Sequence, residues 1–188
     1  WVALEVASCG LRVAGFKNPV SKIQHLESNI RYPALRNLKR LLVMILCLTI
    51  LQVIYGAFTA GLRAGFIYNT FPKMGDEWIA GSVLYAFQQH GFLSLFENPA
   101  TVQFIHRCLG IALAVVVFFT WFRSRKAAIL PVTGNSLIML LLLVIVQIIL
   151  GIVTLLMAVP VYFAVLHQAT AVLVFANVIY CIPTLKVY

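Results

Sequence analysis

The chain has 188 residues, of which 62% are hydrophobic and only 10% are charged, and its mean hydropathy is +0.99. Soluble domains carry roughly 45–50% apolar and about 25% charged residues, so this composition excludes a soluble globular domain, a disordered chain and a disulfide-rich miniprotein. It predicts an integral membrane protein. The net charge of +9 does not indicate nucleic-acid binding, because the basic residues flank apolar runs and form no basic face.

The first forty residues precede the first long apolar run. Residues 1–9 are too short to cross a bilayer, and we expect them to be the tail of a membrane helix that begins earlier in a longer protein. Residues 10–40 hold seven of the fourteen basic residues and one acid, Glu27. Basic clusters beside apolar spans face the cytoplasm or the mitochondrial matrix, so this segment is predicted to be an inner loop.

Four segments are long and apolar enough to cross a bilayer, which requires about 20 residues in a helix. They are residues 41–62, 101–122, 135–157 and 160–182. Pro160 divides the last two, because proline starts a helix well and continues one badly. We therefore predict an all-α four-helix transmembrane bundle over residues 41–188.

The charges between the spans give the orientation. Residues 10–40 and 123–126 are basic and face inward, and Lys186 returns to the same side, as an even number of spans requires. The segment 66–100 holds one lysine against three acids and faces outward. It is rich in aromatic residues, and 82–96 is interpreted either as an amphipathic helix on the membrane surface or as part of a lid over a site between the helices.

The chain contains an internal repeat. Residues 52–59 (Q-V-I-Y-G-A-F-T) match residues 147–154 (Q-I-I-L-G-I-V-T) at Gln, Gly and Thr. Each segment is followed by a span with a histidine near its start, His106 in one case and His167 in the other. The pattern indicates two copies of a helix pair, and we expect the two glutamines to form hydrogen bonds across helices.

The two histidines are the candidate metal ligands, because ionisable residues inside a membrane are costly and mark a function. At 1.5 Å per residue both lie on the order of 8–10 Å below the outer end of their helices. Two imidazoles at equal depth on facing helices can hold a heme iron from both sides. The alternative is that His106 and His167 are separate, each hydrogen-bonded to a neighbouring helix.

Two arginines are candidates for binding heme propionates, because a guanidinium forms bidentate contacts with a carboxylate. Arg63 lies at the outer end of the first span, and Arg107 follows His106. For Arg63 the alternative is that its side chain snorkels to the lipid headgroups. The spans contain no carboxylate and the sequence shows no nucleophile–base arrangement, so no catalytic residue is assigned.

Three long segments together resemble the heme A synthase family. They are G-A-F-T-A-G-L-R-A-G-F-I-Y-N-T-F-P-K-M at 56–74, F-E-N-P-A-T-V-Q-F-I-H-R at 96–107 and L-G-I-V-T-L-L-M-A-V-P-V-Y-F-A-V-L-H-Q-A at 150–169. The resemblance implies an eight-helix protein built from two four-helix halves, of which this chain matches the C-terminal half. The family oxidises the methyl group of heme O to the formyl group of heme A for cytochrome c oxidase assembly.

The resemblance also implies roles for individual residues. His106 and His167 match the pair that ligates heme b, whereas the substrate heme O binds in the other half beside a Glu-x-x-x-His motif. That motif is absent here, since Glu5 is followed at the fourth place by Cys9. This chain is therefore expected to contain the heme b site and to lack the substrate-heme site.

The resemblance implies a multi-pass membrane oxidoreductase of the bacterial plasma (inner) membrane, or alternatively of the mitochondrial inner membrane. Its implied partners are membrane lipid, heme, an electron donor of unknown identity, and heme O synthase or cytochrome oxidase assembly factors. Two other functions fit the same residues. One is a stand-alone b-type membrane cytochrome for electron transfer, and the other is a non-catalytic membrane assembly protein whose histidines bond helices together.

Overall fold

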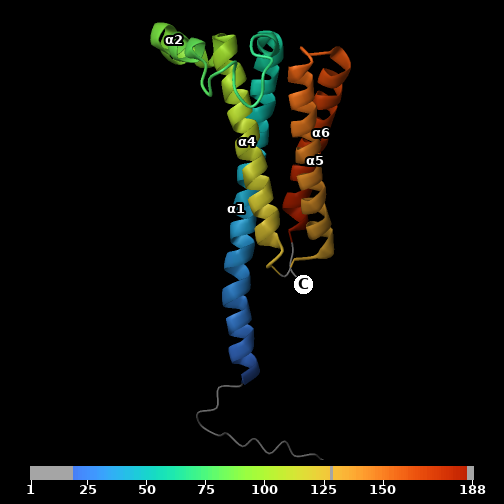
Figure 1. The fold of residues 1–188 in the computed structure, drawn as a ribbon. Helices are drawn as coiled ribbons and strands as arrows, with labels where there is room; N and C mark the ends of the chain where they lie inside the picture. Colours follow the sequence, from blue (N-terminus) through green and yellow to red (C-terminus); the bar gives the residue numbers. More distant parts are fainter. Residues whose placement is uncertain (1–18, 128, 186–188) are drawn as a thin grey trace, which may run out of the picture.

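A computed structural model describes residues 19–127 and 129–185, with side chains from residue 35 onward. Four long helices run side by side as a bundle (Figure 1). They are α1 (Pro19–Gly61), α4 (Pro99–Ser124), α5 (Pro131–Leu156) and α6 (Val161–Thr184). In α1 the stretch Leu35–Gly61, and in the other three the whole helix, is long and apolar enough to cross a membrane. The predicted all-α fold with four spans is confirmed.

The first helix is longer than the sequence predicts. It begins at Pro19, so residues 19–40, expected as an inner loop, are helical and run past the inner ends of the other helices (Figure 1). Proline suits the first position of a helix, and the next 13 residues contain neither glycine nor proline to end it. Residues 1–9, residues 10–18 of the predicted inner loop, and Lys186 lie outside the described residues.

The packing order places α4 and α6 at opposite corners of the bundle. Helix α1 packs along α4, and α5 packs along α6. The two pairs join through contacts of α4 with α5 and of α1 with α6. The four helices therefore form a ring in which α4 and α6 both descend from the outer end, and side chains from these two helices can meet across the centre.

Polar contacts join neighbouring elements of the bundle at both ends. At the outer end, the Asn69 side chain donates to the carbonyl oxygens of Gly65 and Leu155, at 2.8 Å each. At the inner end, the Thr133 hydroxyl donates to the carbonyl oxygen of Thr184. Asn69 thus ties the segment after α1 to the end of α5, whereas Thr133 ties the start of α5 to the end of α6.

The turn between α5 and α6 lies where the sequence predicts it. Helix α5 ends at Leu156, and Pro160 stands immediately before α6. Ala158 and Val159 both have positive φ angles, 56° and 59°, and the Val159 N–H donates to the Thr154 carbonyl at 2.8 Å. Left-handed backbone is uncommon for a β-branched residue, so this turn is a strained one.

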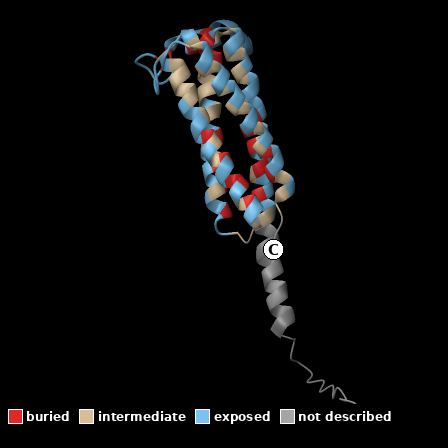
Figure 2. Ribbon diagram, turned by 90° about the vertical axis from the view of Figure 1, so that its right-hand side faces the viewer, coloured by how far each residue is buried: buried red, intermediate tan, exposed pale blue. Residues whose placement is uncertain are grey.

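The apolar core occupies the inner half of the bundle. Its buried residues come from all four helices and are Leu42, Ile45, Leu113, Val117, Leu137, Leu140, Val144, Val174, Val178 and Cys181. Figure 2 shows these buried positions in the inner half and a second group at the outer end, with intermediate positions between them. The inner half is therefore the more tightly packed part of the bundle.

The outer segment between α1 and α4 folds into short helices, η1 (Ala64–Phe66), α2 (Gly81–His90), η2 (Gly91–Leu93) and α3 (Ser94–Glu97). Helix α2 contacts α4 and projects sideways, away from α5 and α6 (Figure 1). Trp78 and Phe92 in this segment are 67% and 77% exposed. Exposed aromatic rings at this level suit the headgroup region, so the structure favours the membrane-surface interpretation of α2 over the lid.

Candidate functional site

His106 on α4 lies against α1. Its Nε2 is 3.3 Å from the Nε2 of Gln52, and its Cε1 would lie 3.3 Å from a Cβ placed on Gly56. Gln52 lies in turn against α4, because a Cβ on Gly110 would be 3.3 Å from its Nε2. The two glycines therefore leave the space that the histidine ring and the glutamine amide fill.

His167 on α6 has the same surroundings on α5. Its Nε2 is 3.4 Å from the Nε2 of Gln147, and its Cε1 would lie only 3.0 Å from a Cβ on Gly151. The third residue of the repeat also matches, since Thr59 and Thr154 each donate to the carbonyl four residues earlier. The two copies of the sequence repeat thus make the same contacts with a histidine of the neighbouring helix. The predicted hydrogen bonding of the glutamines across helices is observed.

The two histidines lie at the same depth. His106 precedes the buried Leu113 by seven residues, and His167 precedes the buried Val174 by seven. Seven residues are about two helical turns, which return to the same face and cover about 10 Å. Both imidazoles therefore face the bundle interior, two helical turns outward of the apolar core.

Each histidine keeps one ring nitrogen that is not engaged. The Nδ1 atoms of His106 and His167 are buried and have no hydrogen-bond partner among the described residues, and the same holds for the Oε1 atoms of Gln52 and Gln147. Turning either amide by 180° would let its oxygen accept from the histidine Nε2–H. In that arrangement Nδ1 carries a free lone pair, which is what a metal ligand requires.

The number of ligands indicates what kind of metal group fits. Across the described part of the chain, no group of three or more His, Cys, Asp or Glu side chains comes together. A bare zinc ion needs at least three protein ligands, whereas a heme iron takes four nitrogens from its own macrocycle and one or two from the protein. His106 and His167, on opposite corners at equal depth, therefore fit a heme and do not fit a bare ion.

Arg107, predicted to bind a propionate, holds the outer segment. Its Nη1 donates to the carbonyls of Thr70 at 2.9 Å and Lys73 at 3.1 Å, and its Nη2 donates to the carbonyl of Tyr68 at 2.8 Å. The buried Gln103, one turn earlier on α4, also donates to Tyr68 at 3.1 Å. This role of Gln103 and Arg107 was not predicted, although their spacing of four places both side chains on one face of the helix.

Arg63 is exposed and has a left-handed backbone, with φ of 52°, where α1 gives way to η1. This place at the outer end of the first span agrees with the snorkelling alternative. The binding of propionates by Arg63 or Arg107 stays a prediction.

Comparison with known proteins identifies related sequences. Residues 11–179 match the profile of a family described as cytochrome oxidase assembly protein. The chain is 38% identical to the heme A synthase of Nitrosospira multiformis over 178 residues, which cover 93% of this chain and 44% of that protein. It is 43% identical to the heme A synthase of Wolbachia pipientis subsp. Culex pipiens over 143 residues, covering 76% and 40%. The mouse heme A synthase is 38% identical over 139 residues, covering 74% and 33%.

No solved structure matches the chain. The chain spans about two fifths of the length of the curated relatives it matches. The family profile nevertheless covers most of the chain, including both histidines and both copies of the repeat. This chain belongs to the cytochrome oxidase assembly protein family that contains the heme A synthases.

Proposed function

We propose that this chain is the heme b-binding half of a heme A synthase, in which His106 and His167 would hold the heme iron. The observation that carries the proposal is the duplicated arrangement of glutamine, glycine and histidine, at one depth and on opposite corners of the bundle. When bound, the heme supplies a one-electron redox centre.

The chain's own residues would position this group. Gln52 and Gln147 lie within hydrogen-bond distance of the imidazoles and would hold their orientation, and each ring keeps a nitrogen without a partner among the described residues. The apolar core beneath the histidines excludes water from the inner side. Arg63 and Arg107 remain our candidates for the propionates, and the Arg107 Nε has no partner among the described atoms.

In the complete protein, we propose that the enzyme oxidises the heme O methyl group to the formyl group of heme A. The names of the relatives support this reaction for the family. The heme O site would belong to the other half, so this half would pass electrons to or from it. The electron donor, and contacts with heme O synthase or assembly factors in a bacterial or mitochondrial inner membrane, belong to the same proposal.

Heme spectra of the chain, produced in heme-replete membranes, test the ligands. Two imidazoles give low-spin six-coordinate iron with sharp reduced α and β bands. We expect His106→Ala and His167→Ala each to lose most of the heme or to give a five-coordinate high-spin spectrum. His90→Ala, in the exposed end of α2, is the control and should leave the spectrum unchanged. A low-spin spectrum at full occupancy in both membrane variants would contradict the assignment.

A second candidate is a non-catalytic assembly protein whose histidines bond helices. One observation favours it, since both histidines already contact a glutamine on the neighbouring helix. Such bonds contribute about 0.6 kcal/mol on average in membranes. This candidate predicts no bound heme in the unsubstituted chain, so the same spectra distinguish the two.

A further inference from the structure

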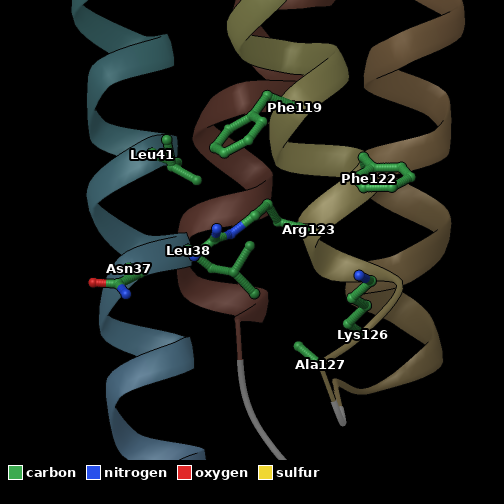
Figure 3. A pocket seen from close by; sticks show the side chains of 8 residues that line it. All are labelled: Asn37, Leu38, Leu41, Phe119, Phe122, Arg123, Lys126 and Ala127. Atoms are coloured by element: carbon green, nitrogen blue, oxygen red, sulfur yellow. The ribbon is translucent and has the colours of Figure 1, made fainter.

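The inner end of the bundle has a groove between α1 and α4, far from the histidines. A hollow of about 350 Å³ is lined by residues that include Asn37, Leu38, Leu41, Phe119, Arg123 and Lys126 (Figure 3). A second hollow of about 290 Å³ shares part of this lining and adds Arg40 and Met44. Together they form one groove that follows α1 from its basic part into its apolar part.

Three cationic side chains, from two helices and the connector between α4 and α5, line this groove. Arg40 comes from α1, Arg123 from the end of α4, and Lys126 from the connector after it. The Arg123 guanidinium lies 5.4 Å from the Phe119 ring centre, and Figure 3 shows it reaching toward α1 beside Leu38. These contacts hold a positive charge over the groove in a defined place.

The charge of the groove is not neutralised within the described protein. The acidic side chains that the structure describes are Asp76, Glu77 and Glu97, and all three belong to the outer segment. The three cations therefore face the inner side without a described carboxylate. Their natural complement is an anion from outside the chain.

The apolar wall indicates which anion fits. Leu41, Met44 and Phe119 line the groove on the membrane side of the cations, within the spanning stretches of α1 and α4. A phosphate from solution would gain nothing from this wall. A phospholipid would place its phosphate on the cations and the start of an acyl chain on the wall, and basic pockets between helices on the inner side are known to take such headgroups.

We propose that this groove binds an acidic phospholipid of the inner leaflet. Arg40, Arg123 and Lys126 contact its phosphate, and Leu41 and Phe119 contact the first part of an acyl chain. The site is independent of heme, and its ligand class is a glycerophospholipid with net negative charge.

The test uses the detergent-solubilised chain, titrated with phosphatidylglycerol that carries a fluorescent acyl chain and followed by anisotropy. Phosphatidylcholine with the same label is the reference lipid. Each basic residue near a membrane surface contributes enough for about a fivefold change in affinity. We therefore expect Arg123→Gln and Lys126→Gln each to bind phosphatidylglycerol about fivefold more weakly. The triple variant that combines both substitutions with Arg40→Gln should bind about a hundredfold more weakly.

Arg125→Gln is the matched control. It removes the same charge from the same connector, but Arg125 lies 5.3 Å from the Trp121 ring and does not line the groove. We expect less than a twofold change for it, and also for Arg123→Lys, which keeps the charge. An equal loss of phosphatidylglycerol affinity in Arg125→Gln and Arg123→Gln would mean that the lipid responds to the overall surface charge, and it would overturn the proposed site.

Two further measurements test which ligand the groove binds. Phe119→Ala should weaken phosphatidylglycerol binding while circular dichroism shows unchanged helix content. Inorganic phosphate should not displace the labelled lipid at millimolar concentration, and displacement would mean a site for free phosphate and overturn the proposal. Equal affinity for phosphatidylcholine would overturn it as well. If Arg123→Gln fails to fold, Lys126→Gln, which lies outside the helix, gives the same comparison with Arg125→Gln.

Discussion

Adding one methyl group at Gly151 should displace His167 without disturbing the helix that carries the glycine. A Cβ at this position would lie 3.0 Å from the His167 Cε1, whereas carbon atoms in contact are normally about 3.5–4.0 Å apart. The Gly151→Ala change must therefore move the His167 ring by a few tenths of an ångström. A ligand set has to be held within about 0.5 Å, so this shift uses much of that tolerance and should weaken the binding of the iron by His167.

Heme content and spin state measure the effect, in chains purified from heme-replete membranes. We expect Gly151→Ala to lose part of the low-spin signal. Gly134→Ala on the same helix is the matched control, because no described atom lies within 4 Å of its Cβ. Alanine is favoured over glycine in helices by roughly 1 kcal/mol, so helix content should not fall in either variant, and a lost heme signal cannot be put down to a lost helix.

Because of the internal repeat, the effects of the three glycine substitutions can be ranked. At Gly56 the corresponding contact with the His106 Cε1 is 3.3 Å, so a smaller shift of the ring is needed there than at Gly151. We expect Gly56→Ala to retain more low-spin heme than Gly151→Ala and less than Gly134→Ala. Full low-spin heme in Gly151→Ala would refute the reasoning, because the histidine would then not ligate from the position described.

Three other predictions follow from the contacts. Arg107→Gln should loosen the outer segment, because it removes charge-assisted donors to three carbonyls. Limited proteolysis should then cut residues 66–98 several times faster, and unchanged cutting would show that the guanidinium does not hold the segment. Gln52→Leu and Gln147→Leu should each weaken heme affinity by about 10–100-fold in a heme titration, to a similar extent because the two sites match, and unchanged affinity would mean that the amides do not orient the imidazoles. Reporters fused within residues 66–98 should lie on the membrane side opposite to reporters at residues 20–35 and at the C-terminus, and a shared side would contradict four spans.

The spans and the depth of the histidines could be predicted because each depends on a local regularity. Apolar length marks a membrane segment, and the constant rise of a helix converts residue number into depth. The helical extension of α1 to Pro19 could not be predicted in this way. Hydropathy indicates where the chain leaves the membrane, and a helix can continue beyond that point. The role of Arg107 was missed because its acceptors are backbone carbonyls more than thirty residues earlier, and a carbonyl acceptor leaves no trace in residue type.

The position of the apolar core inward of both histidines has a consequence for the order of biogenesis. Core residues of all four helices, from Leu42 to Cys181, contact one another directly, so this packing does not pass through the histidine layer. The layer with the unpaired imidazole and amide atoms lies on the outer side of that assembled part. If these histidines hold heme as we propose, we expect cofactor loading to follow the packing of the inner half, because no residue of the inner core belongs to the histidine layer.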